Sequence, residues 1–245
     1  MTGIIFRLTL GQMLGRGRTI LIGILALLPV LIALVYRLGS QDTDQQEWAA
    51  TVLLDGLVVS TFLPLAALVY GTAVLGAEIE DGTAVYLLSK PIARSRIIVG
   101  KLLAAWMLTT ATVLSSGLVA GAIALYDEPK AGILLGFGVG IVLGGLVYSA
   151  LFVLLSVITS RALIAGLIYV FIWEGLVNGF FAGTRLLSVR HYTLGVADAF
   201  VDLPEHDFDA ALDPATALVL MLVFGAAAAW YAVRRLRSFE IGETT

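Results

Sequence analysis

The chain has 245 residues, of which 59% are apolar and 13% are charged, and its formal net charge is -3 at pH 7. Soluble domains carry about twice this share of charged residues, so the composition indicates an integral membrane protein. The absence of cysteine excludes a disulfide framework, a thiolate metal site and a cysteine nucleophile. We expect one membrane domain over residues 1–245.

The N-terminal segment, residues 1–18, predicts an amphipathic elbow helix that lies in the plane of the lipid headgroups. Ile4 and Leu8 fall on one side of such a helix, and Arg7 and Arg16 fall around the other side. A disordered basic tail is the alternative interpretation of this segment.

Long apolar runs predict six transmembrane helices, because a crossing needs about 20 apolar residues. The expected fold is therefore an all-α integral membrane fold with both termini on the same side. The expected crossings are residues 19–36, 52–76, 102–125, 132–159, 162–182 and 215–233.

The basic residues near the ends of these crossings lie mostly on one side. Cytoplasmic loops are enriched in Lys and Arg, so we expect both termini to be cytoplasmic and the protein to be a multi-pass protein of the cell membrane. The basic residues expected on the cytoplasmic side are Arg7, Arg16, Arg18, Lys90, Arg94, Arg96, Lys101, Arg161, Arg234, Arg235 and Arg237, against Arg37, Lys130, Arg185 and Arg190 on the other side.

Asp55 is an ionisable residue in the second crossing, near its predicted outer end. A charge inside hydrocarbon is unfavourable unless it is paired or hydrated. We expect Asp55 either to reach water or to line a transport path.

A polar cytoplasmic loop, residues 78–101, separates the second and third crossings. Gly82 is expected to end the second helix, Thr83 to cap a new one, and Pro91 to end that short helix. Ser95 is expected to cap the third crossing. The product is a short helix beneath the membrane, which either contacts headgroups alone or docks a cytoplasmic partner.

Glycine spacing in the fourth crossing predicts close contact with another helix, because GxxxG patterns let helix backbones approach in lipid. A phosphate-binding loop is excluded, since the run lacks G-x-G-x-x-G and follows no soluble strand. The glycines are Gly132, Gly136, Gly138, Gly140, Gly144 and Gly145.

The fifth crossing contains Glu174 and, one helical turn later on the same face, Asn178. Such a pair is expected to point at the bundle interior, a partner subunit or a cavity. Contact with a transported substrate and a structural hydrogen-bond anchor are equal alternatives for it. The acidic loop at residues 202–213 is expected to be solvated, since it lacks the Gly and the terminal Glu of a calcium loop.

The sequence shows no motif of an active site, since both H-E-x-x-H and G-x-S-x-G are absent. None of the lysines Lys90, Lys101 and Lys130 belongs to a G-x-x-x-x-G-K-[ST] loop. We therefore expect no catalysis, no cofactor, no metal and no nucleic-acid partner for this chain. Any ATP must be bound by another chain.

The segment GAEIEDGTAVYLLSKPIARSRIIVGKLLAAW resembles the signature region of ABC-2 type permeases of ATP-binding-cassette transporters. The segment FRLTLGQMLGRGRTILIG is similar to the elbow helix of that family, and the six-crossing plan agrees over essentially the whole chain. The loop positions that carry the resemblance are Glu78, Gly82, Thr83, Leu87, Leu88, Ser89, Pro91, Arg94, Ser95, Gly100 and Lys101, with Glu80 and Asp81 in the same acidic group.

The resemblance implies a permease subunit without ATPase activity. It implies pairing with a second copy or a sister permease, and docking through the loop at residues 78–101 onto an ABC ATPase subunit that binds ATP and Mg. It also implies export, and an apolar path is most compatible with a hydrophobic or amphipathic substrate.

Two alternatives to this function stay open. One is an ABC-2 permease that serves copper-enzyme maturation, like the nitrous oxide reductase accessory permeases, although four methionines and no cysteine give no sign of a copper path. The other is an ion-coupled secondary carrier that acts without an ATPase. Such a carrier is expected to have midplane charges in both halves of an inverted repeat, whereas Glu174 is the one deep carboxylate.

Overall fold

The computed structural model describes residues 11, 16–39, 44–80, 93–203, 208 and 210–237, and every regular element in these ranges is a helix. Six helical stretches are long and apolar enough to cross a membrane, which confirms the predicted all-α membrane fold. Helices prevail because every backbone N–H and C=O in hydrocarbon must be bonded within the protein. The predicted elbow and coupling helices fall largely outside the described residues.

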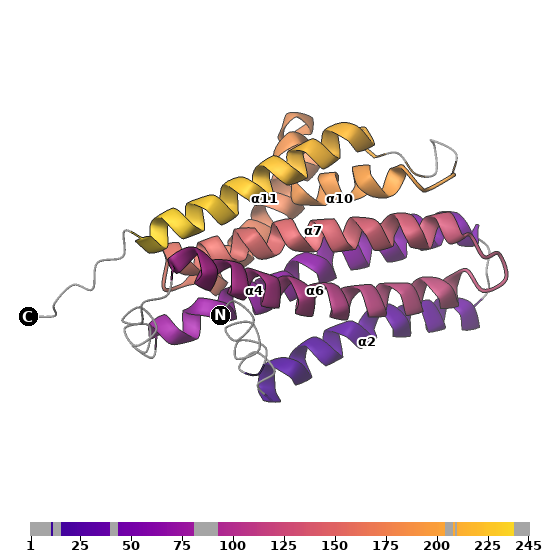
Figure 1. Ribbon diagram of the computed structural model, residues 1–245. Helices are drawn as coiled ribbons and strands as arrows, with labels where there is room; N and C mark the ends of the chain where they lie inside the picture. The colour runs from indigo at the N-terminus through magenta and orange to yellow at the C-terminus, as the bar shows by residue number, and fades with distance from the viewer. Residues whose placement is uncertain are drawn as a thin grey trace, which may run out of the picture.

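The first four crossings are long helices (Figure 1), and a short turn at residues 125–130 joins the third to the fourth. The second of them continues without interruption from an α-helical turn through a wide π-helical segment into a regular α-helix. Their elements are α2 (Arg16–Leu38), α3 (Gln45–Trp48) with η1 (Ala49–Phe62) and α4 (Leu63–Glu80), α6 (Arg94–Ala124), and α7 (Ala131–Ile158).

The rest of the chain is less regular. The fifth crossing changes from α-helix to π-helix, and a short 3-10 turn and a ten-residue helix follow before the last crossing. These elements are α8 (Ala162–Ile168), η2 (Tyr169–Val177), α9 (Asn178–Phe180), η3 (Ala182–Leu187), α10 (Val189–Asp198) and α11 (Pro214–Arg237).

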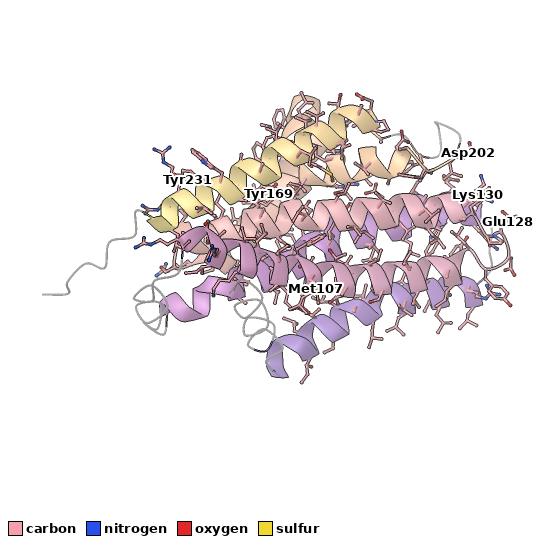
Figure 2. The ribbon with its side chains drawn as sticks, viewed as in Figure 1. Met107, Glu128, Lys130, Tyr169, Asp202 and Tyr231 are labelled. Carbon is pink, nitrogen blue, oxygen red and sulfur yellow. The ribbon has the colours of Figure 1, made fainter. Side chains whose placement is uncertain are left out.

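The two ends of the bundle differ in charge. Figure 2 shows Glu128, Lys130 and Asp202 together at one end, which we call the acidic end, where Lys130 Nζ donates to the carbonyl of Asp202 at 2.8 Å. The opposite end, the basic end, includes Arg161 before α8 and Arg234 near the end of α11. That the basic end is the cytoplasmic one stays a prediction.

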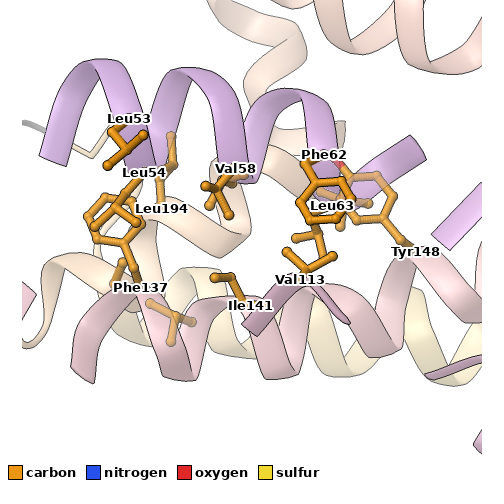
Figure 3. Close-up of a cluster of buried hydrophobic side chains, with 14 of the residues drawn as sticks. Leu53, Leu54, Val58, Phe62, Leu63, Val113, Phe137, Ile141, Tyr148 and Leu194 are labelled. Atoms are coloured by element: carbon orange, nitrogen blue, oxygen red, sulfur yellow. The ribbon is translucent and has the colours of Figure 1, made fainter. Parts of the chain in front are cut away.

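α7 is the central helix of the bundle and packs against α4, α6, α10 and α11. Figure 3 shows part of the core that surrounds it, in which apolar side chains of η1, α4, α6, α7 and α10 meet. Leu54 and Val58 of η1, Val113 of α6, Ile141 of α7 and Leu194 of α10 all lie in this buried cluster. By contrast, α2 and α11 keep many apolar side chains exposed, as expected for helices that border lipid.

The glycines of α7 bring α10 against it. A Cβ atom on Gly136 would lie 2.5 Å from the carbonyl oxygen of Ala197, and one on Gly140 would lie 2.8 Å from that of Thr193. The close approach that the glycine spacing predicts is therefore present, and α10 is the helix that makes it.

Two local expectations from the sequence differ from the structure. The third crossing begins at Arg94, with Ala93 as the N-cap residue and no side-chain cap, so the prediction that Ser95 caps this helix is wrong. Ser95 already lies within the first turn, because the helix starts before it. The segment before the last crossing, taken as an outer loop, contains α10, whose side chains are mostly buried.

Candidate functional site

The fifth crossing is interrupted within the bundle. α10 runs antiparallel to α7, since Gly132 at the start of α7 lies against Phe200 and Gly144, near its middle, lies against Thr193. The first turn of α10 therefore lies close to the middle of the bundle, and the helix runs from there to the acidic end. The chain thus enters as α8 and η2, leaves the helical path, and resumes as α10, which lies beside α7 and α11 (Figure 1).

Glu174 lies at this interruption and is only 4% exposed. Its Oε1 accepts hydrogen bonds from the hydroxyl groups of Tyr148 at 3.2 Å and Tyr169 at 2.9 Å, and from the backbone N–H of Val189 at 2.9 Å. Its Oε2 accepts from Asn178 Nδ2 at 3.3 Å and from the hydroxyl of Ser188. We call these five donors and their acceptor the Glu174 network.

This arrangement compensates for the burial of a carboxylate. Five donors from η2, α7, α9 and the start of α10 take the place of water, whose loss makes an unpaired buried charge so unfavourable. Ser188 is also the N-cap of α10, since its Oγ accepts from the N–H of His191. The carboxylate of Glu174 therefore lies at the positive end of the α10 dipole, which stabilises negative charge.

Asp55 also contacts the first turn of α10. Arg190 donates through Nε and Nη2 to Asp55 Oδ1 at 3.1 and 2.9 Å, and through Nη2 to Oδ2 at 3.0 Å. The Asp55 side chain is 19% exposed and the Arg190 side chain 31% exposed. Of the two expectations for Asp55, neither anticipated this ion pair, because its partner lay in a segment taken as an outer loop.

Both carboxylates lie in π-helical segments, Asp55 in η1 and Glu174 in η2. A π-helix is wider than an α-helix, and such segments occur frequently at functional sites. In η1 the hydroxyl of Ser60 donates to the carbonyl of Asp55, five residues earlier, at 2.7 Å, and to its Oδ1 at 3.0 Å. The wide turn therefore helps to orient the carboxylate toward Arg190.

An apolar pocket of about 470 Å³ lies beside the Glu174 network, toward the basic end. Its lining includes Val147 and Leu154 of α7, Tyr169 of η2, Phe224 of α11 and Val189 at the start of α10. Two of these residues belong to both features. The Tyr169 ring lines the pocket while its hydroxyl donates to Glu174, and Val189 contributes its side chain to the pocket and its N–H to Glu174.

The structure brings only some of the sequence-predicted site residues together. Glu174 and Asn178 are in direct contact, and Asp55 joins them indirectly through the first turn of α10. Asn178 Nδ2 donates to Glu174, while its Oδ1 is buried without a hydrogen-bond partner in the described part of the protein. The sequence analysis missed Tyr148, Tyr169, Ser188 and Arg190, although Ser188 before an apolar-periodic stretch was a detectable N-cap signal.

The loop residues assigned to ATPase coupling are described only at the edges of the loop. Glu78 and Glu80 belong to the last turn of α4, and Arg94 and Ser95 begin α6, where Arg94 donates to the carbonyl of Leu236 in α11.

Two further residues of this set lie in α6. Gly100 is buried, and the side chain of Lys101 is 1% exposed, with its Nζ donating to the carbonyl of Val74 in α4. Lys101 therefore connects the two helices that flank the loop. The remaining residues of the set lie outside the described residues: Asp81, Gly82, Thr83, Leu87, Leu88, Ser89 and Pro91.

Comparison with protein families gives one finding for this chain. A family model described as "ABC-2 family transporter protein" matches residues 11–197, which is more than half of the chain. A comparison with curated proteins found no match. The matched region includes α2 to α9, the Glu174 network and most of α10, and it ends before α11.

Proposed function

Because the chain belongs to the ABC-2 family of transporter proteins, a family of membrane components of ABC transporters, we propose that it is the permease subunit of an ATP-driven exporter. The observation that carries this proposal is the family match across residues 11–197, together with six helices able to cross a membrane. The chain itself supplies the path, and ATP with Mg is bound and hydrolysed on a separate ATPase subunit. Both termini are cytoplasmic.

The ATPase acts on the permease through residues 78–101. In this proposal the acidic group that starts with Glu78 and the short helix after it dock onto the ATPase. The contacts of the flanking helices support the idea, because Lys101 ties α6 to α4 and Arg94 ties the start of α6 to the end of α11. A displacement of the loop would therefore move three crossings together, and nucleotide binding would shift the population between inward-open and outward-open states.

The transport path runs along the interrupted fifth crossing. Glu174, Asn178 and Asp55 border this path, and the apolar pocket beside Tyr169 receives a hydrophobic or amphipathic substrate. The pocket volume of about 470 Å³ lies in the range of about 300–1,000 Å³ that is usual for sites of small molecules. A second copy of this chain, or a sister permease, completes the path across the bilayer.

The test is affinity purification of the full chain from its native membrane in mild detergent, followed by mass spectrometry and an ATPase assay. We expect a P-loop ATPase to co-purify with the chain in a stoichiometric ratio. Its rate of ATP hydrolysis should change when apolar compounds are added. Glu78→Arg is expected to abolish this association without preventing membrane insertion, because it reverses charge in the docking segment. Glu47→Arg, an exposed glutamate near the acidic end, is the matched control and should leave the association intact.

Two results would contradict the proposal. Purification of the chain without any ATPase, under conditions that preserve other ABC complexes, would favour a carrier that acts alone. Retention of the ATPase by the Glu78→Arg variant at the level of the Glu47→Arg control would remove residues 78–101 as the docking element.

A further inference from the structure

α11 leads from the pocket beside the Glu174 network to two arginines at the basic end. The residues of α11 that line the pocket are Phe224, Ala227, Ala228 and Tyr231, which follow one face of the helix. The same face continues three and four residues later with Arg234 and Arg235, both exposed at the basic end. The apolar stretch from Phe224 to Tyr231 rises by about 10 Å along the helix axis. Arg234 and Arg235 follow in the next helical turn.

The lining residues from η2 belong to a segment with the same order of apolar and cationic groups. Tyr169 and Trp173 of η2 line the pocket, and the helix that leads into η2 is α8, which begins directly after the exposed residue Arg161. Both helical segments therefore carry arginine at the basic end, outside the pocket, and apolar and aromatic lining residues toward the middle of the bundle. At that inner end the pocket is lined by Val189, whose backbone N–H donates to the carboxylate of Glu174.

The pocket opens sideways rather than along the bundle axis. Phe224 is 36% exposed and Tyr231 is 45% exposed although both line the pocket, and Leu187 at its inner end is 48% exposed. Exposed side chains at this depth of a membrane protein border the hydrocarbon of the bilayer. A molecule already dissolved in that leaflet reaches the pocket without crossing a polar surface.

We propose that this pocket is a lateral entry site for an anionic lipid of the leaflet at the basic end, with an acyl chain in the pocket and the headgroup phosphate at Arg234, Arg235 and Arg161. The inference deepens the proposed function, on which it rests, by naming the substrate class. Arginine suits the role because its guanidinium binds phosphate oxygens in pairs. The apolar lining accepts the chain because it offers almost no polar partner.

The Glu174 network accounts for the depth at which the lipid stops. Five donors of the protein bond the Glu174 carboxylate, so it is already satisfied when no lipid occupies the pocket. The headgroup phosphate is repelled by this negative charge and attracted by the arginines at the other end. The charges therefore orient the lipid, with its chain toward Glu174 and its phosphate toward the basic end.

The test is photocrosslinking of the full-length chain in phosphatidylcholine nanodiscs. The two probes are phosphatidylglycerol and phosphatidylcholine that carry the same diazirine in the acyl chain, and mass spectrometry locates the adducts. We expect the phosphatidylglycerol probe to label pocket residues of η2 and α11. Arg234→Gln with Arg235→Gln should reduce this labelling about 25-fold, since each cation near an anionic headgroup contributes about fivefold, and should leave the phosphatidylcholine probe unchanged.

Matched variants separate the pocket from the general surface of the protein. Ala227→Trp fills the pocket and is expected to suppress labelling, whereas Ala226→Trp, on the neighbouring exposed residue outside the pocket, should not. Arg96→Gln removes an exposed arginine of α6, which does not line the pocket, and should also have no effect.

Equal labelling of the pocket by both probes would overturn the assignment of an anionic headgroup. Labelling that persists in Ala227→Trp would overturn the placement of the acyl chain. The crosslinking uses the permease without its ATPase, so a negative result removes the lipid site and leaves the proposed permease function standing. Failure to co-purify an ATPase removes the proposed function and leaves the labelling result in place.

Discussion

The fourth and fifth crossings reach the middle of the bundle in different ways. α7 is one regular α-helix of 28 residues, and its glycines leave a smooth surface against which α10 lies. The fifth crossing changes to a π-helix, leaves the helical path and starts again at Ser188. A continuous helix satisfies its own backbone, whereas an interrupted one leaves backbone groups that other residues must bond, here through Glu174.

Removal of the Glu174 carboxylate should be the strongest way to disrupt the interrupted crossing while leaving α7 intact. Glu174→Ala leaves five donors without their acceptor, and each buried unsatisfied group costs about 1–3 kcal/mol. We therefore expect the free energy of unfolding to fall by at least about 3 kcal/mol. Glu174→Gln keeps the shape and one acceptor oxygen, and should change transport more than assembly. Thermal unfolding of the purified chain in detergent measures the stability, and size-exclusion chromatography measures assembly.

The control for this prediction is Glu47→Ala, which removes an exposed glutamate and should change stability by less than about 0.5 kcal/mol. If Glu174→Gln lost assembly while the surviving complex kept normal specific transport, Glu174 would be an anchor alone. If Glu174→Ala unfolded at the temperature of the Glu47→Ala control, the network would not stabilise the interruption.

A substitution in α7, the regular helix, should weaken its contact with α10. Gly140→Ala places a Cβ atom 2.8 Å from the carbonyl oxygen of Thr193, so α10 must shift, at a cost of about 1–3 kcal/mol. Gly138→Ala is the matched control, because its Cβ meets only Leu114 Cδ1 at 3.6 Å and Leu118 Cδ2 at 4.0 Å. Gly138→Ala should leave the free energy of unfolding unchanged or raise it by up to about 1 kcal/mol, because alanine has a higher helix propensity than glycine.

Unfolding temperatures of these two variants give the comparison directly. Equal effects of Gly140→Ala and Gly138→Ala would mean that the close contact of α7 with α10 contributes nothing beyond ordinary packing.

The smallest expected effect concerns the ion pair of α10 with the second crossing. A double-mutant cycle of Asp55→Asn and Arg190→Gln should give a coupling of about 1 kcal/mol, since the pair is bidentate but partly exposed. The cycle is measured from the unfolding of the two single variants and the double variant. Additive effects of the two substitutions would show that the pair does not help to hold α10.

The sequence allowed the regular part of the fold to be predicted because the signals for it are local. An apolar run long enough to cross the bilayer identifies a helix without knowledge of its neighbours, and the six crossings follow from that rule alone. The glycine pattern of α7 indicated a close contact, although it did not identify α10 as the partner. Residues 189–198 were missed because ten residues with Arg190 and His191 among them do not resemble a membrane segment.

The candidate site was predictable in its central residue and not in its surroundings. Glu174 is conspicuous because a carboxylate in an apolar run needs a partner. Tyr148, Tyr169 and Ser188 are common residues whose spacing along the chain gives no sign that their hydroxyl groups meet.

By itself, then, the sequence determined the membrane environment, the number of crossings, the charge asymmetry of the two ends and the presence of a deep carboxylate. Each of these depends on the composition of a short stretch of chain. The tertiary structure alone decided that the fifth crossing is interrupted, that Glu174 and Asp55 both hold the first turn of α10, and that an apolar pocket lies beside them. Those features depend on which helices lie side by side, because hydrogen bonds and pockets form between segments that are distant in sequence.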